Sequence, residues 1–445
     1  MTRQPTEAPP SAPDFAARRR RVHAALDGDV MVLGAAPVRL RSRDTEYPYR
    51  ADSELYYLTG CTDPDVVAVL SGGSEPDLTL FVPERDETRE LWSGRRMGPD
   101  EARERHGADH AWPASELDAR LPGLLASARR IHARLGAGTE LERLVIAALV
   151  AARARGQRHG TGPRAVVDPG QILDEMRLIK DAWEIRALRE AAAVTVEGHR
   201  QGLAALAPGL GEWAVQARID GTFRAAGASG PGFETIVGAG ANACVLHYVS
   251  NSATVAEGDL VLMDAGAEVG LYHGDVTRTA PASGRFTAEQ RALHDLVDAA
   301  RAAGVAAAVP GATVGSVHDA AVAVLVEGLV ELGVLTGSPD TLIESEAYKA
   351  FFPHNTSHWL GLDVHDPGDY ARDGSSRVLE PGMVLTVEPG LYVPTGADGG
   401  AARFAGMGIR IEDDLLVTAD GPENLTGDLP GGADAMEALV AGGAR

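Results

Sequence analysis

Two aspartates stand eleven residues apart in the segment 260–279, where apolar strand-like residues are interrupted by glycines. If the chain reverses in a two-residue hairpin loop at Val269 and Gly270, Asp264 lies directly opposite Asp275, with Cβ atoms about 5 Å apart. Like charges in that arrangement destabilise a sheet, and apolar neighbours raise the cost. Either the pair is solvated at a sheet edge or, as we expect, it clamps a divalent cation.

Two glutamates supply further candidate ligands. Glu388 ends the apolar run 383–387, and Glu412 follows the run 408–411. A charge at the end of a buried strand needs a partner. One such residue would be unremarkable, but two of them beside an aspartate pair favour a metal site over isolated surface charges.

A histidine cluster points to the same chemistry. Three of the 13 histidines, His354, His358 and His365, fall within twelve residues. A single buried histidine is commonly a packing residue, whereas a group is typical of metal ligands or proton-transfer groups. With one of these histidines, four carboxylates would balance two divalent ions, and a mostly oxygen ligand set favours Mn²⁺. Cys61 and Cys244 lack the spacing of a thiolate site.

The elements that must position these residues form two domains. Strand-like runs alternate with charged helical stretches through residues 15–170, at 29–34, 66–70 and 78–82, which predicts an α/β domain. A long amphipathic helix over 172–203 then opens a second domain, 171–445. Its further helices are expected at 212–226, 287–309 and 314–335, and its strands at 235–237, 260–268, 383–387 and 409–417, an α+β pattern. Residues 1–14 carry four prolines and are expected to form a flexible tail.

Composition excludes several partners. Among 445 residues, Lys and Arg number 41 against 63 Asp and Glu, a formal net charge of −22. Such a field repels phosphate backbones and anionic lipid, so we expect neither a nucleic-acid nor a membrane partner. No apolar run approaches the roughly 18 residues of a membrane span, and the N-terminus has no signal-peptide core. These features predict a cytoplasmic protein.

The ordered residues Asp, Asp, His, Glu, Glu resemble the metal-dependent Xaa-Pro peptidases of the pita-bread family, most closely their bacterial aminopeptidase P branch. The resemblance rests on Asp264-Ala-Gly, Gly274-Asp-Val-Thr-Arg, Ser357-His-Trp-Leu-Gly-Leu-Asp-Val-His, Val387-Glu-Pro-Gly and Gly408-Ile-Arg-Ile-Glu-Asp-Asp. Upstream, it extends to Tyr47-Pro-Tyr-Arg, Leu55-Tyr-Tyr-Leu-Thr-Gly, Leu91-Trp-Ser-Gly-Arg-Arg and Met176-Arg-Leu-Ile-Lys. It implies an α/β N-terminal domain followed by a pita-bread catalytic domain with a curved antiparallel sheet.

The resemblance also implies a ligand set for two divalent ions. Asp264 and Asp275 are matched to one ion, while His358, Glu388 and Glu412 complete the second, with Asp275 and Glu412 bridging both. A bridging water would lose a proton to become the hydroxide that attacks the peptide carbonyl. Glu388 is the implied proton acceptor and the later donor to the leaving nitrogen.

The remaining matched positions belong to the substrate side of the site. His247 matches a histidine near the scissile bond, and His354 and His365 match two that line the substrate site. Arg410 and Tyr392 match positions that support these groups. With His247 or His365 stabilising the oxyanion, the implied reaction releases the N-terminal residue from peptides with proline in the second position. The X-Pro bond has no N–H, so a dedicated pocket is required.

Two other functions stay open within the same fold. A prolidase, restricted to X-Pro dipeptides, shares the five ligands, and sequence does not show whether space exists beyond the proline. A metal-free pita-bread protein could bind peptides or hydrolyse a small amidine compound, but such relatives are expected to have lost several ligands.

The N-terminal domain is expected to control access and to support a homo-oligomer. Trp92 matches a tryptophan that the bacterial enzymes contribute across a subunit interface. A concave catalytic sheet also needs a cover that excludes water and limits access to peptide termini.

Overall fold

The computed structural model describes residues 12–73, 77–158 and 160–443. They form two compact units, divided between residues 176 and 177. The predicted flexible tail, 1–14, lies almost entirely outside the described residues. Within the described part of the chain, no helix has both the length and the apolar character that crossing a membrane requires.

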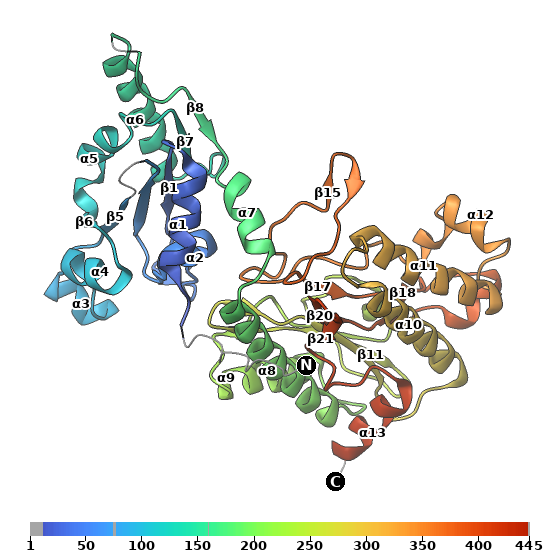
Figure 1. The fold of residues 1–445 in the computed structure, drawn as a ribbon. Helices are drawn as coiled ribbons and strands as arrows, with labels where there is room; N and C mark the ends of the chain where they lie inside the picture. Colours follow the sequence, from blue (N-terminus) through green and yellow to red (C-terminus); the bar gives the residue numbers. More distant parts are fainter. Residues whose placement is uncertain (1–11, 74–76, 159, 444–445) are drawn as a thin grey trace, which may run out of the picture. The chain divides into compact units, whose positions relative to one another are not determined.

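The N-terminal unit is a mixed six-stranded sheet with helices on both faces, drawn in blue to teal in Figure 1. Its strand order is β6-β5-β4-β1-β7-β8, from His110–Pro113, Asp77–Val82, Val67–Ser71, Val30–Gly34, Arg130–His132 and Ala165–Val167. Val30 and Val32 pack against α5 and α6 (Leu117–Leu124 and Glu140–Gly156). The opposite face carries α1 and α2 (Phe15–Leu26 and Ser53–Thr59). Each predicted strand-like run forms a strand, so the α/β prediction is confirmed.

Smaller elements complete this unit. They are the β2–β3 hairpin, Leu40–Ser42 and Thr45–Glu46, and the helices α3, Glu87–Ser93, and α4, Gly98–His106. Helix α3 buries none of its residues.

The prediction of a single helix over 172–203 is wrong. The chain instead forms two helices, α7 (Gly170–Leu178) and α8 (Ala182–Ala205). Asp181 caps α8 by accepting from the backbone N–H of Glu184 at 2.9 Å, and the Glu184 side chain accepts from the Asp181 N–H at 3.0 Å. This reciprocal capping box starts a new helix. The N–H of Lys180 donates to Gly382 O, so the intervening turn is fixed by tertiary contacts.

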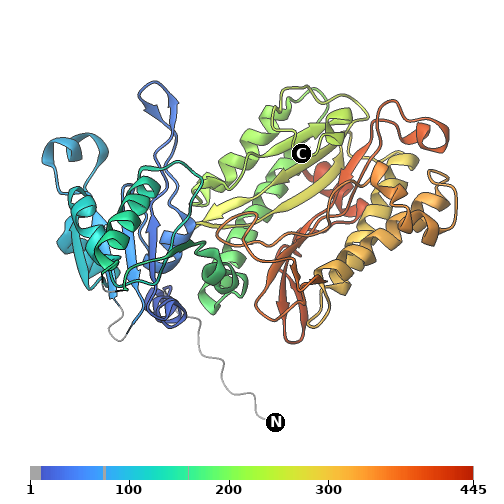
Figure 2. The ribbon, with the colours of Figure 1, turned by 90° about the horizontal axis from the view of Figure 1, so that it is seen from above.

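The C-terminal unit has antiparallel sheets between two pairs of helices. In Figure 2 the strands run between the green helices α8 and α9 and the gold helices α10 and α11. The helices after α8 are α9 (Glu212–Ala225), α10 (Ala288–Ala307), α11 (Val314–Glu331), α12 (Pro339–Glu344) and α13 (Ala433–Gly443). Helices α8 and α9 pack on the sheet β10-β11-β14, whereas α10 and α11 pack against β18 and β19.

The strands of this unit are short, and most of them are buried. They are β9 (Gly230–Pro231), β10 (Ile236–Ala239), β11 (Leu260–Ala265), β12 (Ala267–Val269), β13 (Tyr272–His273), β14 (Val276–Pro281), β15 (Ala371–Arg372), β16 (Ser375–Ser376), β17 (Val384–Val387), β18 (Gly390–Tyr392), β19 (Gly408–Arg410), β20 (Asp413–Thr418) and β21 (Gly421–Asn424). All residues of β11 and β14 are buried, as expected for strands covered on both faces. Strands β15, β16 and β21 are not buried.

The register predicted for the aspartate hairpin is wrong, because the turn begins one residue later than predicted and the cross-strand partner of Asp264 therefore shifts by two residues. The turn is made by Gly270 and Leu271, both at positive φ, as a type I′ turn requires. Val269 pairs with Tyr272 instead of entering the turn. Asp264 therefore lies opposite Thr277, and Asp275 is its diagonal neighbour. Residues two apart share a sheet face, so the two carboxylates still point to the same side.

The strand predicted over 409–417 is divided. Strand β19 pairs with β18, whereas β20 pairs with β17, so the chain changes partner strand between Arg410 and Asp413. Glu412 occupies this crossover, and its N–H donates to Thr277 O on β14. The break places the Glu412 carboxylate next to the aspartate pair instead of along a regular strand.

Candidate active site

A cavity of about 580 Å³ opens in the C-terminal unit. Nine of the predicted site residues line it: His247, Asp264, Asp275, His354, His358, His365, Glu388, Arg410 and Glu412. Tyr392 lies behind this lining, and Trp92 belongs to the N-terminal unit. Segments as distant in sequence as β11 and β19 therefore bring their chemically active side chains into one pocket.

Three predicted metal ligands converge most closely. Asp275, His358 and Glu412 each offer one ligand atom within 4.8 Å of the others. The Nε2 atom of His358 lies 3.4 Å from Asp275 and 3.8 Å from Glu388. Its Nδ1 lies 3.0 Å from the Trp359 carbonyl oxygen, which can accept a hydrogen bond only if Nδ1 carries the ring proton. That tautomer leaves Nε2 as a free lone pair facing the carboxylates, the arrangement of a metal-binding histidine.

The electrostatics of this group call for a cation. Burial, and then the neighbouring Asp264, raise the pKa of Asp275 well above its ordinary value. Burial, and then Asp275, do the same to the pKa of Glu412. Burial and the nearby Glu412 raise the pKa of Glu388 to about 8. Carboxylates that repel one another in a desolvated site are stabilised by a positive ion between them.

Asp264 belongs to the carboxylate cluster and also contacts the guanidinium of Arg410. Its Oδ2 accepts a short hydrogen bond from Arg410, and Arg410 also donates from Nε to the Thr277 hydroxyl at 3.0 Å. The buried Oδ1 of Asp264 has no hydrogen-bond partner. A buried carboxylate oxygen without a donor costs free energy, and a metal ion is the partner that fits an otherwise anionic neighbourhood.

A chain of hydrogen bonds orients His354, and burial keeps this side chain neutral. Arg410 donates to the Tyr392 hydroxyl oxygen at 2.9 Å, which leaves that hydroxyl free to donate to His354 Nε2 at 2.8 Å. His354 Nδ1 lies 2.8 Å from Asn355 O and 3.7 Å from Glu388. Burial, and then Arg410, lower the pKa of His354 to about 4. Tyr392 thus orients His354 without lining the cavity.

His247 and His365 are the more exposed histidines of the pocket. The His365 ring meets the His358 ring edge-on, with centroids 4.5 Å apart. Burial, and then His358 and His247, lower the pKa of His365. His247 comes from the irregular segment that follows β10 and lines the same pocket. The two rings can therefore approach one bound substrate from different elements.

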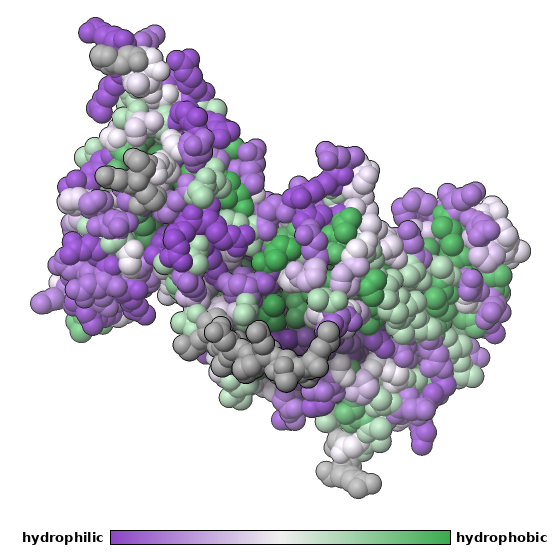
Figure 3. Space-filling view, viewed as in Figure 1, coloured by the Kyte–Doolittle hydropathy of each residue, from purple (hydrophilic) through white to green (hydrophobic). Residues whose placement is uncertain are grey.

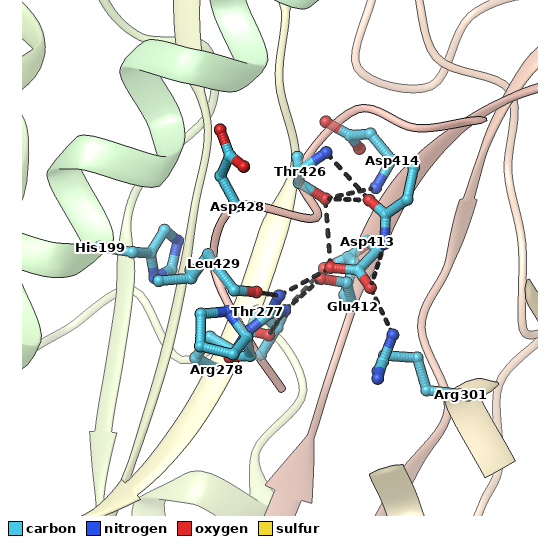
Figure 4. A network of polar contacts seen from close by, with 12 residues as sticks. His199, Thr277, Arg278, Arg301, Glu412, Asp413, Asp414, Thr426, Asp428 and Leu429 are labelled. Carbon is cyan, nitrogen blue, oxygen red and sulfur yellow. Dashed lines mark hydrogen bonds and ion pairs between the residues drawn. The ribbon is translucent and has the colours of Figure 1, made fainter. Parts of the chain in front are cut away.

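A second layer of polar groups lies behind the carboxylates (Figure 4). The Asp414 side chain accepts from the Asp275 N–H at 3.0 Å, and the Thr277 hydroxyl donates to Glu412 at 2.6 Å. The fully buried Arg278 donates to Glu412 O at 2.6 Å and to Asp413 at 2.7 Å. These bonds fix the backbone on which two of the predicted ligands stand.

Trp92 is not part of this pocket. It lies on α3 and its side chain is 87% exposed, beside Leu91 at 81%. Two adjacent apolar side chains so exposed are unusual, because burying each would stabilise the protein by about 2 kcal/mol. The role predicted for Trp92 stays a prediction.

The sequence reasoning missed several residues at the site. Thr277 could have been found, because it stands two residues after Asp275 and shares its sheet face. Phe233, Glu234 and Tyr370 also line the pocket, but they lie in segments between regular elements and carry no motif. Tyr370 precedes the β15–β16 hairpin, whose hydrophilic tip protrudes in Figures 1 and 3.

Comparisons with known proteins cover nearly the whole chain. Residues 186–419 match the sequence model of metallopeptidase family M24, and residues 15–132 match that of the aminopeptidase P N-terminal domain. The chain is 41% identical to the Xaa-Pro aminopeptidase of Escherichia coli over 97% of this chain and 98% of that protein. It superposes on aminopeptidase PepP of Pseudomonas aeruginosa with a TM-score of 0.92 at 42% identity, covering 97% and 98% of the two chains. For zinc-substituted E. coli aminopeptidase P in complex with product, the TM-score is 0.94 at 40% identity, covering 98% and 100%.

Proposed function

The chain belongs to metallopeptidase family M24 and is a metalloexopeptidase that releases the N-terminal residue preceding proline, and we propose which side chains perform that reaction. Its two units have the aminopeptidase P N-terminal fold and the pita-bread fold. The observation that carries the proposal is the cluster of buried, mutually repelling carboxylates and His358 in the pocket lining. That cluster needs cations and faces a cavity large enough for a short peptide.

Divalent metal ions, which family membership implies, fit the residues present. The unpartnered Asp264 oxygen, the carboxylates of Asp275 and Glu412 and the free lone pair of His358 form an oxygen-rich donor set. We assign two ions to these four residues and Glu388. Hard oxygen donors with one imidazole favour Mn²⁺. When bound, the ions supply an activated water and polarise the substrate carbonyl.

Glu388 is the proposed proton carrier. It lies between His358 and His354, 3.8 Å and 3.7 Å from their nearest nitrogens, at the pocket wall. Water adds to the peptide carbonyl while Glu388 takes its proton, and the C–N bond then breaks as Glu388 delivers that proton to the proline nitrogen. His247 and His365 are assigned to the carbonyl oxygen, where an N–H stabilises the developing negative charge.

The preference for proline follows from its chemistry. An X-Pro bond has no N–H, so an enzyme that recognises this group in its substrates rejects the bond. Here His354 and His365 are the proposed walls of the proline pocket, and Tyr392 and Arg410 keep His354 in one orientation. A neutral, oriented imidazole presents an apolar ring face to the proline ring.

The test is hydrolysis of matched X-Pro-Y, X-Ala-Y and X-Pro peptides with Mn²⁺ added. We expect release of X from X-Pro-Y and little cleavage of X-Ala-Y. Cleavage of X-Pro alone would identify a prolidase, and equal cleavage of X-Ala-Y would refute the proline pocket. Metal analysis after incubation with Mn²⁺ is the companion measurement, because a protein that takes up no stoichiometric metal would refute the ligand assignment.

We also propose that the chain is a homo-oligomer in which Trp92 of one subunit covers the active site of another. The exposed Leu91 and Trp92 on an otherwise unburied helix support this proposal. The N-terminal domain, assigned to residues 15–170, would then control access. Light scattering that shows a monomer would refute it.

A cytoplasmic location is proposed as well. Cys61 and Cys244 are both free thiols, which a reducing compartment preserves. Cell fractionation followed by detection of the protein tests this location, and recovery outside the cytoplasm would overturn it.

A further inference from the structure

We infer that Glu212 is a positioning residue that holds His247 in the active site. The inference rests on the proposed function, because it concerns a histidine assigned to the substrate carbonyl. It begins from the segment 240–253, which leaves β10 through a short 3-10 turn and then runs without regular structure. Leu246, His247 and Val249 of this segment line the pocket.

Apolar packing holds the middle of this segment only in part. Val245 and Val249 are 54% and 44% exposed, and His247 is exposed as well. Leu246 and Tyr248, which flank His247, are partly buried against a small core cluster. A loop that alternates exposed and partly buried side chains is expected to open locally at lower free-energy cost than the core. Hydrogen bonds are therefore expected to add to this packing in fixing the position of His247.

The Glu212 carboxylate supplies those bonds. Glu212 is the first residue of α9 and is fully buried. Its Oε1 accepts from the Ala239 N–H at 2.8 Å and from Asn242 Nδ2 at 3.0 Å. Its Oε2 accepts from the Tyr248 hydroxyl at 2.9 Å and from the Ala253 N–H at 2.7 Å. Three of the donors lie near the start, in the middle and at the end of the segment, and the fourth, Ala239, immediately precedes it.

These hydrogen bonds hold Tyr248, the residue that follows His247, in a fixed position. Asn242 Nδ2 also lies 3.0 Å from the Tyr248 hydroxyl, so Glu212, Asn242 and Tyr248 form one triangle of hydrogen bonds. The backbone N–H of Glu212 donates to Ala253 O at 2.9 Å, which ties the far end to the helix. Because Glu212 and Asn242 fix the Tyr248 side chain, the backbone that carries the adjacent, pocket-lining His247 is fixed as well.

The site requires a carboxylate and not merely a polar residue. Within the described part of the chain no ion pair reaches Glu212. Its charge is stabilised by four donors and by its place in the first turn of α9. An amide has one acceptor oxygen, so Glu212→Gln would turn an N–H toward two of the four donors and leave them without partners.

The experiment is a double-mutant cycle of Glu212→Gln with His247→Ala, measured as kcat for an X-Pro-Y peptide at saturating metal. In the wild-type background we expect Glu212→Gln to lower kcat by roughly tenfold to a hundredfold, since small displacements of catalytic groups cost that much. In the His247→Ala background the same substitution should cost less than about threefold. Metal content should be unchanged in all variants.

Two further measurements separate positioning from folding. Hydrogen exchange should become faster in residues 242–253 of Glu212→Gln, while α9 stays protected. Arg224→Met is the control, because Arg224 lies on the same helix and donates to Ala228 O, outside the loop. It should give the same kcat ratio in both backgrounds. If Glu212→Gln fails to fold, Tyr248→Phe replaces it in the cycle, since it removes one of the four bonds.

The inference is overturned if Glu212→Gln, or its replacement, reduces kcat equally with and without His247, or leaves exchange of the loop unchanged. It is also overturned if His247→Ala alone retains the wild-type kcat. That last result would leave metal-dependent cleavage of X-Pro-Y by the wild type intact, so it is distinguishable from failure of the proposed function.

Discussion

Arg278→Met tests whether the buried charges behind the metal ligands act as a unit. The Arg278 side chain is fully buried and makes five hydrogen bonds, to Asp413 and to the carbonyls of Thr277, Glu412, Leu429 and Pro430. Methionine approximates the length of the chain but keeps neither the charge nor the donors.

The expected loss in the free energy of unfolding depends on how well the remaining Asp413 carboxylate is still compensated. Removing one partner of a buried ion pair destabilises a protein by about 3–5 kcal/mol. Asp413 would keep Arg301 at 2.6 Å, Asn424 at 2.9 Å and Thr426 at 3.1 Å, so its charge stays partly compensated. We therefore expect a loss at the lower end, roughly 3 kcal/mol.

Native-state hydrogen exchange in β14 and β20 is the assay, because it reports on the C-terminal unit alone. Arg189→Met is the matched control: its pair with Glu423 is about half exposed and should be worth less than about 1 kcal/mol. Adding Asp413→Asn should restore part of the stability of Arg278→Met by removing the undercompensated charge. A change within about 1 kcal/mol for Arg278→Met, or no recovery in the double variant, would refute the reasoning.

Four other outcomes are expected. Asp275→Asn and Glu412→Gln should each lower kcat more than roughly 100-fold, with loss of metal by elemental analysis; full activity with metal retained would contradict the ligand assignment. His358→Ala should lose metal affinity in calorimetric titration, and unchanged affinity would exclude it as a ligand. Trp92→Ala should keep the oligomer in light scattering but lower kcat/KM for X-Pro-Y by roughly tenfold, whereas an active monomer would refute the cover. Burial lowers the pKa of His294 from 6.5 to about 4, so between these pH values the unfolded state binds a proton that the folded state does not. The free energy of unfolding should therefore fall by up to roughly 3 kcal/mol as the pH drops through that window. His294→Phe should make the difference in the free energy of urea unfolding between pH 7.5 and 4.5 smaller, and an unchanged difference would exclude His294 as its cause.

The sequence alone predicted the fold class and the family. Strand runs such as 78–82 and helices such as 287–309 carry their own periodicity, and local patterns of this kind survive in any tertiary context. The five ordered acidic and imidazole side chains were recognisable because their motifs are contiguous. Their individual roles stay predictions, although the structure places all five in one cavity.

Register and element breaks needed the tertiary structure. The pattern around Gly270 permitted two turns, and only the pairing of Val269 with Tyr272 selected the turn at Gly270 and Leu271. The division before Glu412 arises because β19 and β20 have different partner strands. Neither the position of the turn nor the division of the strand can be recognised from the residue types of its segment.

The supporting residues were the least visible in sequence. Glu212 reads as an ordinary acidic residue in the first turn of a helix, a position that suits acids without any further partner. Its four donors come from Ala239, Asn242, Tyr248 and Ala253, up to 41 residues away. Residue type and local spacing therefore determined which side chains could bind metal and move protons. Only folding decided which groups hold them in place, because the partners of a buried charge are chosen by proximity in space and not by distance along the chain.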